Sequence, residues 1–153
     1  MKSKIIIITG DPNSINSEII YKSWKKINKN LKSKIYFISN YNLLKKQFKK
    51  LRYKTKITQV DNIYDEVHSK GLKIININLK FNHLFSVKKN DASKFIIDTL
   101  NLGHTIALKE DVLGLINCPI NKKLLPKKKI GVTEYLASKC SVQDNSEVMI
   151  IKS

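Results

Sequence analysis

Polar side chains of the kinds that hold phosphate occur in three groups along the chain. The first group is residues 10–18 (GDPNSINSE), directly after the apolar run Ile5 to Ile8. Asp11 offers a carboxylate there, and Ser14 or Ser17 could cap a following helix whose free N–H groups attract anions. An ordinary strand-to-helix turn, closed by the Asp11 side chain, explains the same residues without a ligand. The segment is neither a P-loop nor a G-x-G-x-x-G loop.

The second and third groups lie further along the chain. In residues 117–123 (NCPINKK), Asn121 and Lys122 could reach a ligand, with Lys122 as a point charge for phosphate. Alternatively, Asn121 caps the next turn and Lys122 is solvated. In residues 131–134 (GVTE), Thr133 supplies a hydroxyl and the start of a helix, which suits a phosphate. A simple N-cap role for Thr133 explains the third group equally well.

The cysteines and histidines give no recognisable site. Cys118 precedes a proline and is predicted to be a buried, inert thiol, and with Cys140 it forms no C-x-x-C pair. We interpret both as reduced thiols of a cytoplasmic protein. His68, His83 and His104 form neither H-x₃-H nor H-E-x-x-H, so each is predicted to be a surface or packing residue.

Apolar periodicity predicts the elements that must position these groups. Strands are expected at 4–9, 34–39, 56–60, 73–79, 112–117 and 147–151. Helices are expected at 17–28, 41–51, 92–108 and in a short run capped by Thr133. Asn90 or Asp91 is expected to cap the long helix, which Gly103 interrupts. This alternation predicts an α/β fold with a mostly parallel sheet and helices on both faces, whose ligands bind at the carboxyl ends of strands.

Length and composition fit one soluble globular domain or half of a larger one. The chain has 153 residues, of which 42% are hydrophobic and 27% are charged. No apolar run approaches the roughly 20 residues of a membrane span. The four-residue apolar run after the N-terminal lysines is too short for a signal peptide. We therefore expect a cytoplasmic location and no membrane partner.

The net charge of +17 is the most unusual property of the composition. Of the 29 basic residues only Arg52 is an arginine, so 28 are lysines. Proteins that read nucleic acid favour arginine, because its planar fork grips phosphate and guanine with two bonds. The charge therefore indicates a solvated lysine surface with weak, salt-sensitive contact to polyanions, and no specific nucleic-acid partner.

Together and in this order, the three groups resemble the N-terminal part of the 4-hydroxythreonine-4-phosphate dehydrogenase family of pyridoxal phosphate biosynthesis. The family motif G-D-P-x-G-I-G-P-E-I is similar to residues 10–19, T-A-P-I-N-K to 117–122, and G-H-T-E-F-L-A to 131–137. A D-x-A-x-G-like stretch is loosely matched at 90–93. The resemblance covers essentially the whole chain. Its departures are Ser14 and Asn16 for two glycines, Ser17 for proline, and Val132 for a histidine that contacts substrate.

The resemblance implies an isocitrate/isopropylmalate dehydrogenase-like fold. Residues 1–153 would form a single α/β region corresponding to the N-terminal half of the family enzyme, with the C-terminal half absent. The implied reaction is NAD-dependent oxidation and decarboxylation of 4-phosphohydroxy-threonine. Thr133, Asn121, Lys122 and Asp11 would help to hold this phosphorylated substrate.

The resemblance also places the family's metal-binding histidines and most of its NAD site beyond the position that matches Ser153. It therefore implies a chain that binds neither NAD nor the divalent metal tightly, carries no catalytic residue and is inactive alone. Its partner would be a C-terminal half or a homodimer partner. Val132 favours an alternative, a non-catalytic decayed homologue or phosphate-ligand binding domain. The charge favours another, a basic nucleic-acid-binding module.

Overall fold

Five parallel strands form one sheet in the computed structural model, which describes residues 3–65, 71–126 and 131–140. The strand order is β3-β4-β2-β1-β5. The strands are β1 (Lys4–Ile8), β2 (Ile35–Ser39), β3 (Ile57–Val60), β4 (Leu72–Asn76) and β5 (Val112–Asn117). Five of the six predicted strands are confirmed, and the predicted strand 147–151 lies outside the described residues.

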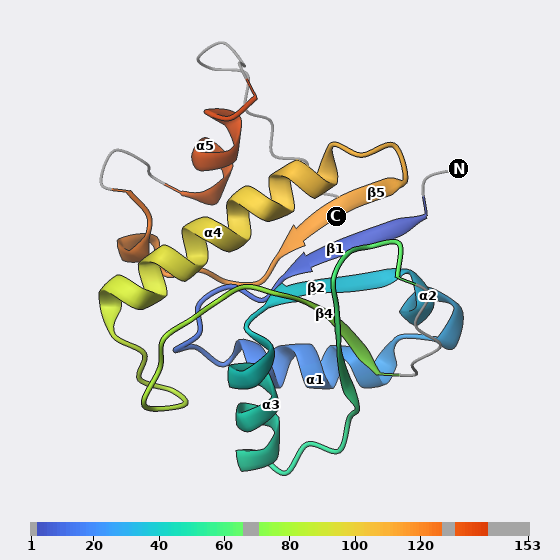
Figure 1. Cartoon of the computed structure of the whole chain (residues 1–153), viewed down its shortest axis with the longest axis horizontal. Helices are drawn as coiled ribbons and strands as arrows, with labels where there is room; N and C mark the ends of the chain where they lie inside the picture. Colours follow the sequence, from blue (N-terminus) through green and yellow to red (C-terminus); the bar gives the residue numbers. More distant parts are fainter. Residues whose placement is uncertain (1–2, 66–70, 127–130, 141–153) are drawn as a thin grey trace, which may run out of the picture.

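Helices cover both faces of the sheet, as predicted (Figure 1). On one face α4 (Lys89–Ala107) packs Phe95 and other apolar side chains against Ile6 and Ile8 of β1. On the other face, Trp24 and Phe48 come from α1 (Asn16–Lys26) and α3 (Tyr41–Lys50). The remaining elements are the short helices α2 (Lys29–Lys34), η1 (Lys122–Leu124) and α5 (Val132–Ala137). No helix in the described part of the chain is long and apolar enough to cross a membrane.

Polar side chains end β4 earlier than the sequence pattern suggests. The predicted strand 73–79 stops at Asn76, whose Oδ1 accepts a hydrogen bond from the N–H of Tyr41 at 2.9 Å. Asn40 Nδ2 donates to the carbonyl of Ile77 at 2.8 Å, and Asn40 Oδ1 accepts from the N–H of Leu43 at 2.8 Å. These amides therefore bond the backbone groups just beyond the carboxyl ends of β2 and β4, where the chain enters α3 after β2 and leaves the sheet after β4.

The start of α4 also differs from the prediction. The helix begins at Lys89, so Asn90 and Asp91 lie in its first turn, and no side chain caps it. Val87, two residues before the helix, is instead held by a residue that is distant in the sequence. Asn13 Nδ2 donates to the carbonyl of Val87 at 2.9 Å, and the N–H of Val87 donates to Asn13 Oδ1 at 2.6 Å. A tertiary contact has therefore replaced the local cap that the sequence suggested.

Gly103 does not interrupt α4, contrary to the prediction. It lies buried within the helix, and a Cβ there would stand 2.7 Å from Cδ1 of Ile8. The glycine therefore marks a close approach of α4 to β1, which brings the helix down onto the middle of the sheet.

The outer strand β5 exposes apolar side chains. Leu113 is 63% exposed and Ile116 is 53% exposed. A Cβ at Gly114 would meet nothing within 4 Å. Among the described residues, no further strand pairs with β5. The sheet is therefore well covered in its centre and open at this edge.

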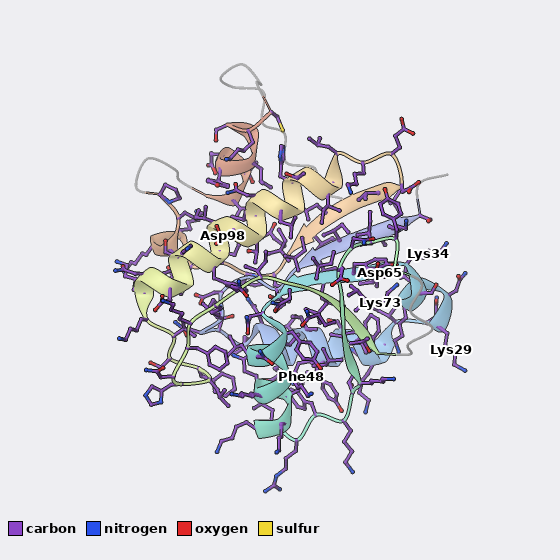
Figure 2. All side chains as sticks on the ribbon, viewed as in Figure 1. Lys29, Lys34, Phe48, Asp65, Lys73 and Asp98 are labelled. Carbon is purple, nitrogen blue, oxygen red and sulfur yellow. The ribbon has the colours of Figure 1, made fainter. Side chains whose placement is uncertain are left out.

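A buried lysine lies near the amino-terminal ends of the strands, opposite the carboxyl ends where ligands are expected. Lys73 on β4, labelled in Figure 2, is 3% exposed. Its Nζ donates to the carbonyl of Ser33 and lies 3.7 Å from the centre of the Tyr36 ring. Burial, and secondarily the charge of Lys4, lowers the pKa of Lys73 from 10.5 to about 8. The fold therefore holds this ammonium group at a cost in stability.

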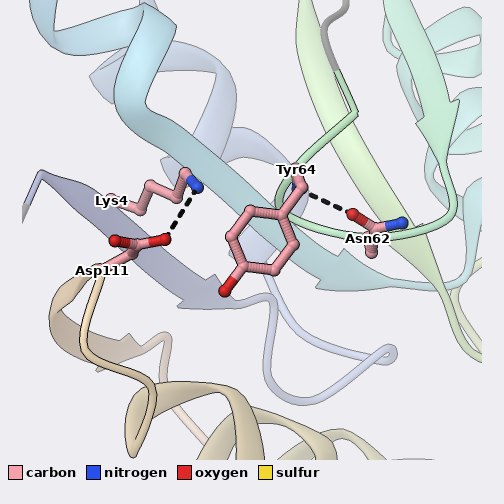
Figure 3. A network of polar contacts seen from close by, with 4 residues as sticks. All are labelled: Lys4, Asn62, Tyr64 and Asp111. Atoms are coloured by element: carbon pink, nitrogen blue, oxygen red, sulfur yellow. Dashed lines mark hydrogen bonds and ion pairs between the residues drawn. The ribbon is translucent and has the colours of Figure 1, made fainter.

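The charge of Lys4 is better compensated than that of Lys73, because it has a carboxylate partner as well as an aromatic ring (Figure 3). Its Nζ lies 3.5 Å from Oδ2 of Asp111 and 4.0 Å from the centre of the Tyr64 ring. Tyr64 is placed by its own N–H, which donates to Asn62 Oδ1 at 2.7 Å. These contacts join the start of β1 to the turn after β3 and to the loop before β5.

Candidate functional site

The first loop is a turn that its own side chains close. Asp11 is buried at the end of β1, and its Oδ1 accepts from the N–H of Asn13 at 2.9 Å. Ser14 Oγ donates to the Asp11 carbonyl at 2.8 Å. The N-cap of α1 is Ile15, and no side chain bonds there as a cap. The predicted cap by Ser17 is therefore wrong, because Ser17 lies inside the helix. Ser14 is not the N-cap residue, but its Oγ accepts from the N–H of Asn16, the first helical residue, at 3.2 Å, so the Ser14 alternative is met in part.

Hydrogen bonds join the first loop to the second. The N–H of Asp11 donates to the Pro119 carbonyl at 3.2 Å, and Asn16 Nδ2 donates to the same oxygen at 2.8 Å. Gly10 adopts a φ of 72°, and a Cβ there would stand 2.6 Å from Asn16 Nδ2 and 2.6 Å from the Pro119 oxygen. The two loops therefore approach as closely as a residue without a side chain permits.

Another polar side chain, on α3, also holds the first loop, and the sequence analysis did not identify it. Gln47 Nε2 donates to the carbonyl of Pro12 at 3.0 Å and to that of Leu84 at 2.6 Å. Gln47 is buried between Leu44 and Phe48 on the inner side of the helix. That position in an apolar stripe was the available signal, because a buried amide needs hydrogen-bond partners.

The second loop presents two of the predicted binding residues to solvent. Asn121 caps η1, with its Oδ1 accepting from the N–H of Lys123 at 3.1 Å, so the capping alternative is confirmed. Asn121 and Lys122 are both exposed. Cys118 is buried, and burial raises the pKa of its thiol to about 11, as the inert-thiol prediction requires. Neither Cys118 nor Cys140 is in a disulfide.

The third loop is carried by α5, which rests on α4. Tyr135 is buried, and its hydroxyl donates to Asn101 Oδ1 at 2.7 Å. Helix α5 begins at Val132 with Gly131 as N-cap and no capping side chain, so the predicted cap at Thr133 is wrong. Thr133 is the second helical residue and is exposed. Its hydroxyl is therefore not used as a cap.

The structure thus joins Asp11 to the second loop through Pro119. Within the described ranges, no hydrogen bond or ion pair connects Thr133 to Asp11, Asn121 or Lys122. In the same ranges, no group of three or more His, Cys, Asp or Glu side chains could hold a metal ion. His83 and His104 lie in the described part of the chain, and His68 lies outside it.

A cleft beside these loops was missed by the sequence reasoning. It lies at the carboxyl ends of β2 and β4, against α4, and has a volume of about 800 Å³. Its lining includes Asn42, Asn78, Lys80, Lys94 and Asp98, the last labelled in Figure 2. This volume is in the range of small-molecule sites. Its residues come from three separate segments, so no local motif announces it.

Comparisons with known proteins agree on the architecture and on the family. The family model described as "Pyridoxal phosphate biosynthetic protein PdxA" matches residues 14–153. A structure from Salmonella typhimurium, assigned as a 4-hydroxythreonine-4-phosphate dehydrogenase, has a TM-score of 0.74 at 20% identity, covering 90% of this chain and 44% of that one. The corresponding enzyme structure from Burkholderia phymatum has a TM-score of 0.67 at 17% identity, covering 90% and 43%.

The chain therefore spans less than half the length of the solved structures that it matches. A 111-residue stretch is also 25% identical to the ATP-dependent DNA helicase Hel308 of Methanococcus vannielii. That match covers 70% of this chain and 15% of the helicase. The likeness to the helicase is too low, and covers too little of it, to assign a family.

Proposed function

The chain belongs to the pyridoxal phosphate biosynthetic protein PdxA family, and we propose from this that it forms the N-terminal portion of a 4-hydroxythreonine-4-phosphate dehydrogenase-like protein. Its part in that protein is to hold the phosphorylated substrate. The observation that carries the proposal is the junction of the first and second loops at Pro119. This junction fixes Asn121 and Lys122 beside the carboxyl edge of the sheet, where α/β proteins bind their ligands.

The exposed polar groups have the chemistry that a phosphate ester requires. We assign the Lys122 ammonium to the phosphate as a point charge, and the Asn121 amide nitrogen and the Thr133 hydroxyl as donors to its oxygens. Asp11 is buried and one of its oxygens accepts from Asn13; we assign the other oxygen to a hydroxyl or amine of the substrate. Val132 offers no such group, and it is the position where the site is weakest.

In the reaction that the family implies, the substrate's secondary alcohol would be oxidised, with NAD supplying hydride acceptance and a divalent metal supplying polarisation of the alcohol oxygen when they are bound. The described residues supply no metal cluster, so we derive no metal-dependent step from them. The proposal gives them binding and orientation of the substrate. The complete reaction further requires residues that match the remaining length of the relatives.

We expect the purified 153-residue chain alone to form no NADH from 4-phosphohydroxy-threonine. The reason is that it corresponds to 44% of the length of the Salmonella typhimurium relative. The measurement is NADH absorbance, with a full-length family enzyme as positive control. Activity that appears on adding a separately expressed C-terminal half supports the split-enzyme form of the proposal. NADH production by the chain alone contradicts it.

A binding experiment tests the assigned residues directly. Val132→His should tighten binding of 4-phosphohydroxy-threonine about ten- to hundredfold, since one charge-assisted hydrogen bond contributes roughly 1.5–3 kcal/mol. Thr133→Ala and Lys122→Gln should weaken it. Titration calorimetry measures the affinities. The control variant Lys109→Gln also removes one positive charge, but just beyond the C-terminal end of α4, and should leave the affinity unchanged. Equal affinity in all four variants and the parent would eliminate the substrate-binding proposal.

A further inference from the structure

A small polar cavity lies beneath the first loop, between the start of α1 and the ends of β1 and β2. Its volume is about 20 Å³, and its lining includes Asn16, Ser17 and Ser39 together with apolar Ile20 and Phe95. A cavity needs roughly 10–15 Å³ to hold one water molecule. The space therefore suits a single water and is too small for an organic ligand.

Two buried polar atoms of this lining, Asn16 Oδ1 and Ser17 Oγ, have no hydrogen-bond partner among the residues that the structure describes. Asn16 is 3% exposed and Ser17 is 4% exposed, so bulk water does not reach either side chain. The amide orientation of Asn16 is fixed by its nitrogen, which donates to the Pro119 carbonyl at 2.8 Å and lies 3.4 Å from the Asp11 carbonyl. The amide oxygen is therefore the polar atom of Asn16, a lining residue of the cavity, that still requires a donor.

We propose that this cavity binds one water molecule that donates to Asn16 Oδ1 and accepts from the Ser17 hydroxyl. Ser39 also lines the cavity, with its Oγ 2.9 Å from Thr9 Oγ1, so its hydroxyl is the third polar group beside the water. A buried water typically makes about three such bonds. A bound cation does not fit this set, because it would leave the Ser17 proton without an acceptor.

The water ties together two of the three residues by which the first motif departs from the family pattern. Asn16 and Ser17 stand where that pattern has glycine and proline, and neither of those has a polar side chain. In this chain the Asn16 side-chain nitrogen bonds the second loop at Pro119, and the water donates a hydrogen bond to the oxygen of the same amide. The two departures are therefore coupled, and the loop is rebuilt in a different way.

Thermal unfolding of the full chain distinguishes a hydrated cavity from a dry one by the sign of the effect. With the water in place, Ser17→Ala removes one of its partners and should lower the Tm by about 2–4 °C relative to Ser23→Ala. Ser23 lies exposed on the same helix, so it corrects for helix propensity. In a dry cavity, Ser17→Ala deletes an unsatisfied hydroxyl and raises the Tm, and that result overturns the proposal.

Water–protein cross-relaxation in isotope-labelled full chain gives the second readout. A long-lived water should give a cross-peak to the Asn16 side-chain NH₂ in the parent and in Ser23→Ala. Absence of this cross-peak from both proteins also overturns the proposal. A cross-peak that weakens in Ser17→Ala supports the bridge between the two side chains.

Discussion

Gly10→Ala should destabilise the protein by about 3 kcal/mol or more. A φ of 72° at this position costs a residue with a Cβ about 1–2 kcal/mol. The new Cβ would also stand 2.6 Å from the Pro119 carbonyl oxygen and 2.8 Å from that of Cys118. Because these are backbone atoms, they can move only if the first and second loops separate, and such overpacking costs roughly 1–3 kcal/mol.

Urea denaturation followed by circular dichroism measures this loss, with Gly114→Ala as the matched control. A Cβ at Gly114 has open space, and its position in a strand makes alanine neutral or slightly favourable. Titration calorimetry should also show weaker phosphate-ester binding by Gly10→Ala at temperatures where this variant is folded. Equal unfolding free energies for the two variants would show that the loops relax freely, against the close approach described above.

Lys73→Met should stabilise the protein at neutral pH, by up to about 3 kcal/mol. The pKa of Lys73 falls from 10.5 to about 8 on folding, and each pKa unit corresponds to roughly 1.4 kcal/mol. Methionine has a similar length and no charge to desolvate, so it keeps the packing around Tyr36. The lost hydrogen bond to the Ser33 carbonyl offsets part of the gain, which makes the figure an upper value.

The pH dependence of the difference identifies its cause. Below pH 8 the amine is protonated in both states, so the full cost is present in the parent protein. Between about pH 8 and 10.5 the folded state releases its proton first, and the stability of the parent rises with pH. The advantage of Lys73→Met should therefore shrink over this window. The exposed Lys56→Met should change stability by less than about 0.5 kcal/mol, and an equal gain there would contradict the burial argument.

The fold was predictable because its strands consist largely of apolar residues. Residues 112–117 were predicted with the bounds that β5 has, and the inward side chains of α1 and α3 followed from helical spacing. Apart from the predicted interruption at Gly103, the errors fall at element ends whose position depends on residues distant in the sequence. Asn76 ends β4 by bonding Tyr41, and Asn13 holds the start of α4 through Val87. Local propensity contains no information about such partners.

The candidate site was predictable only in its location. The three loops were identified, and the Asp11 turn and the Asn121 cap were among the stated alternatives. The connection between the first and second loops through Asn16 was not predicted. An asparagine in place of a family glycine suggests only that the family residue has been lost. The contact becomes visible only when the second loop is placed beside the first. Substrate contact by Thr133, Asn121, Lys122 and Asp11 stays a prediction.

The open edge at β5 bears on how the protein behaves in concentrated solution. Within the described residues β5 has no partner on its outer side, and a strand edge with exposed Leu113 and Ile116 favours pairing between copies, which is a common starting point of aggregation. The net charge of +17 opposes that encounter, because every pair of copies repels before the edges meet. Salt shortens the range of this repulsion to about 8 Å at physiological ionic strength. The lysines thus act as colloidal protection for the sheet, and this protection weakens as salt rises.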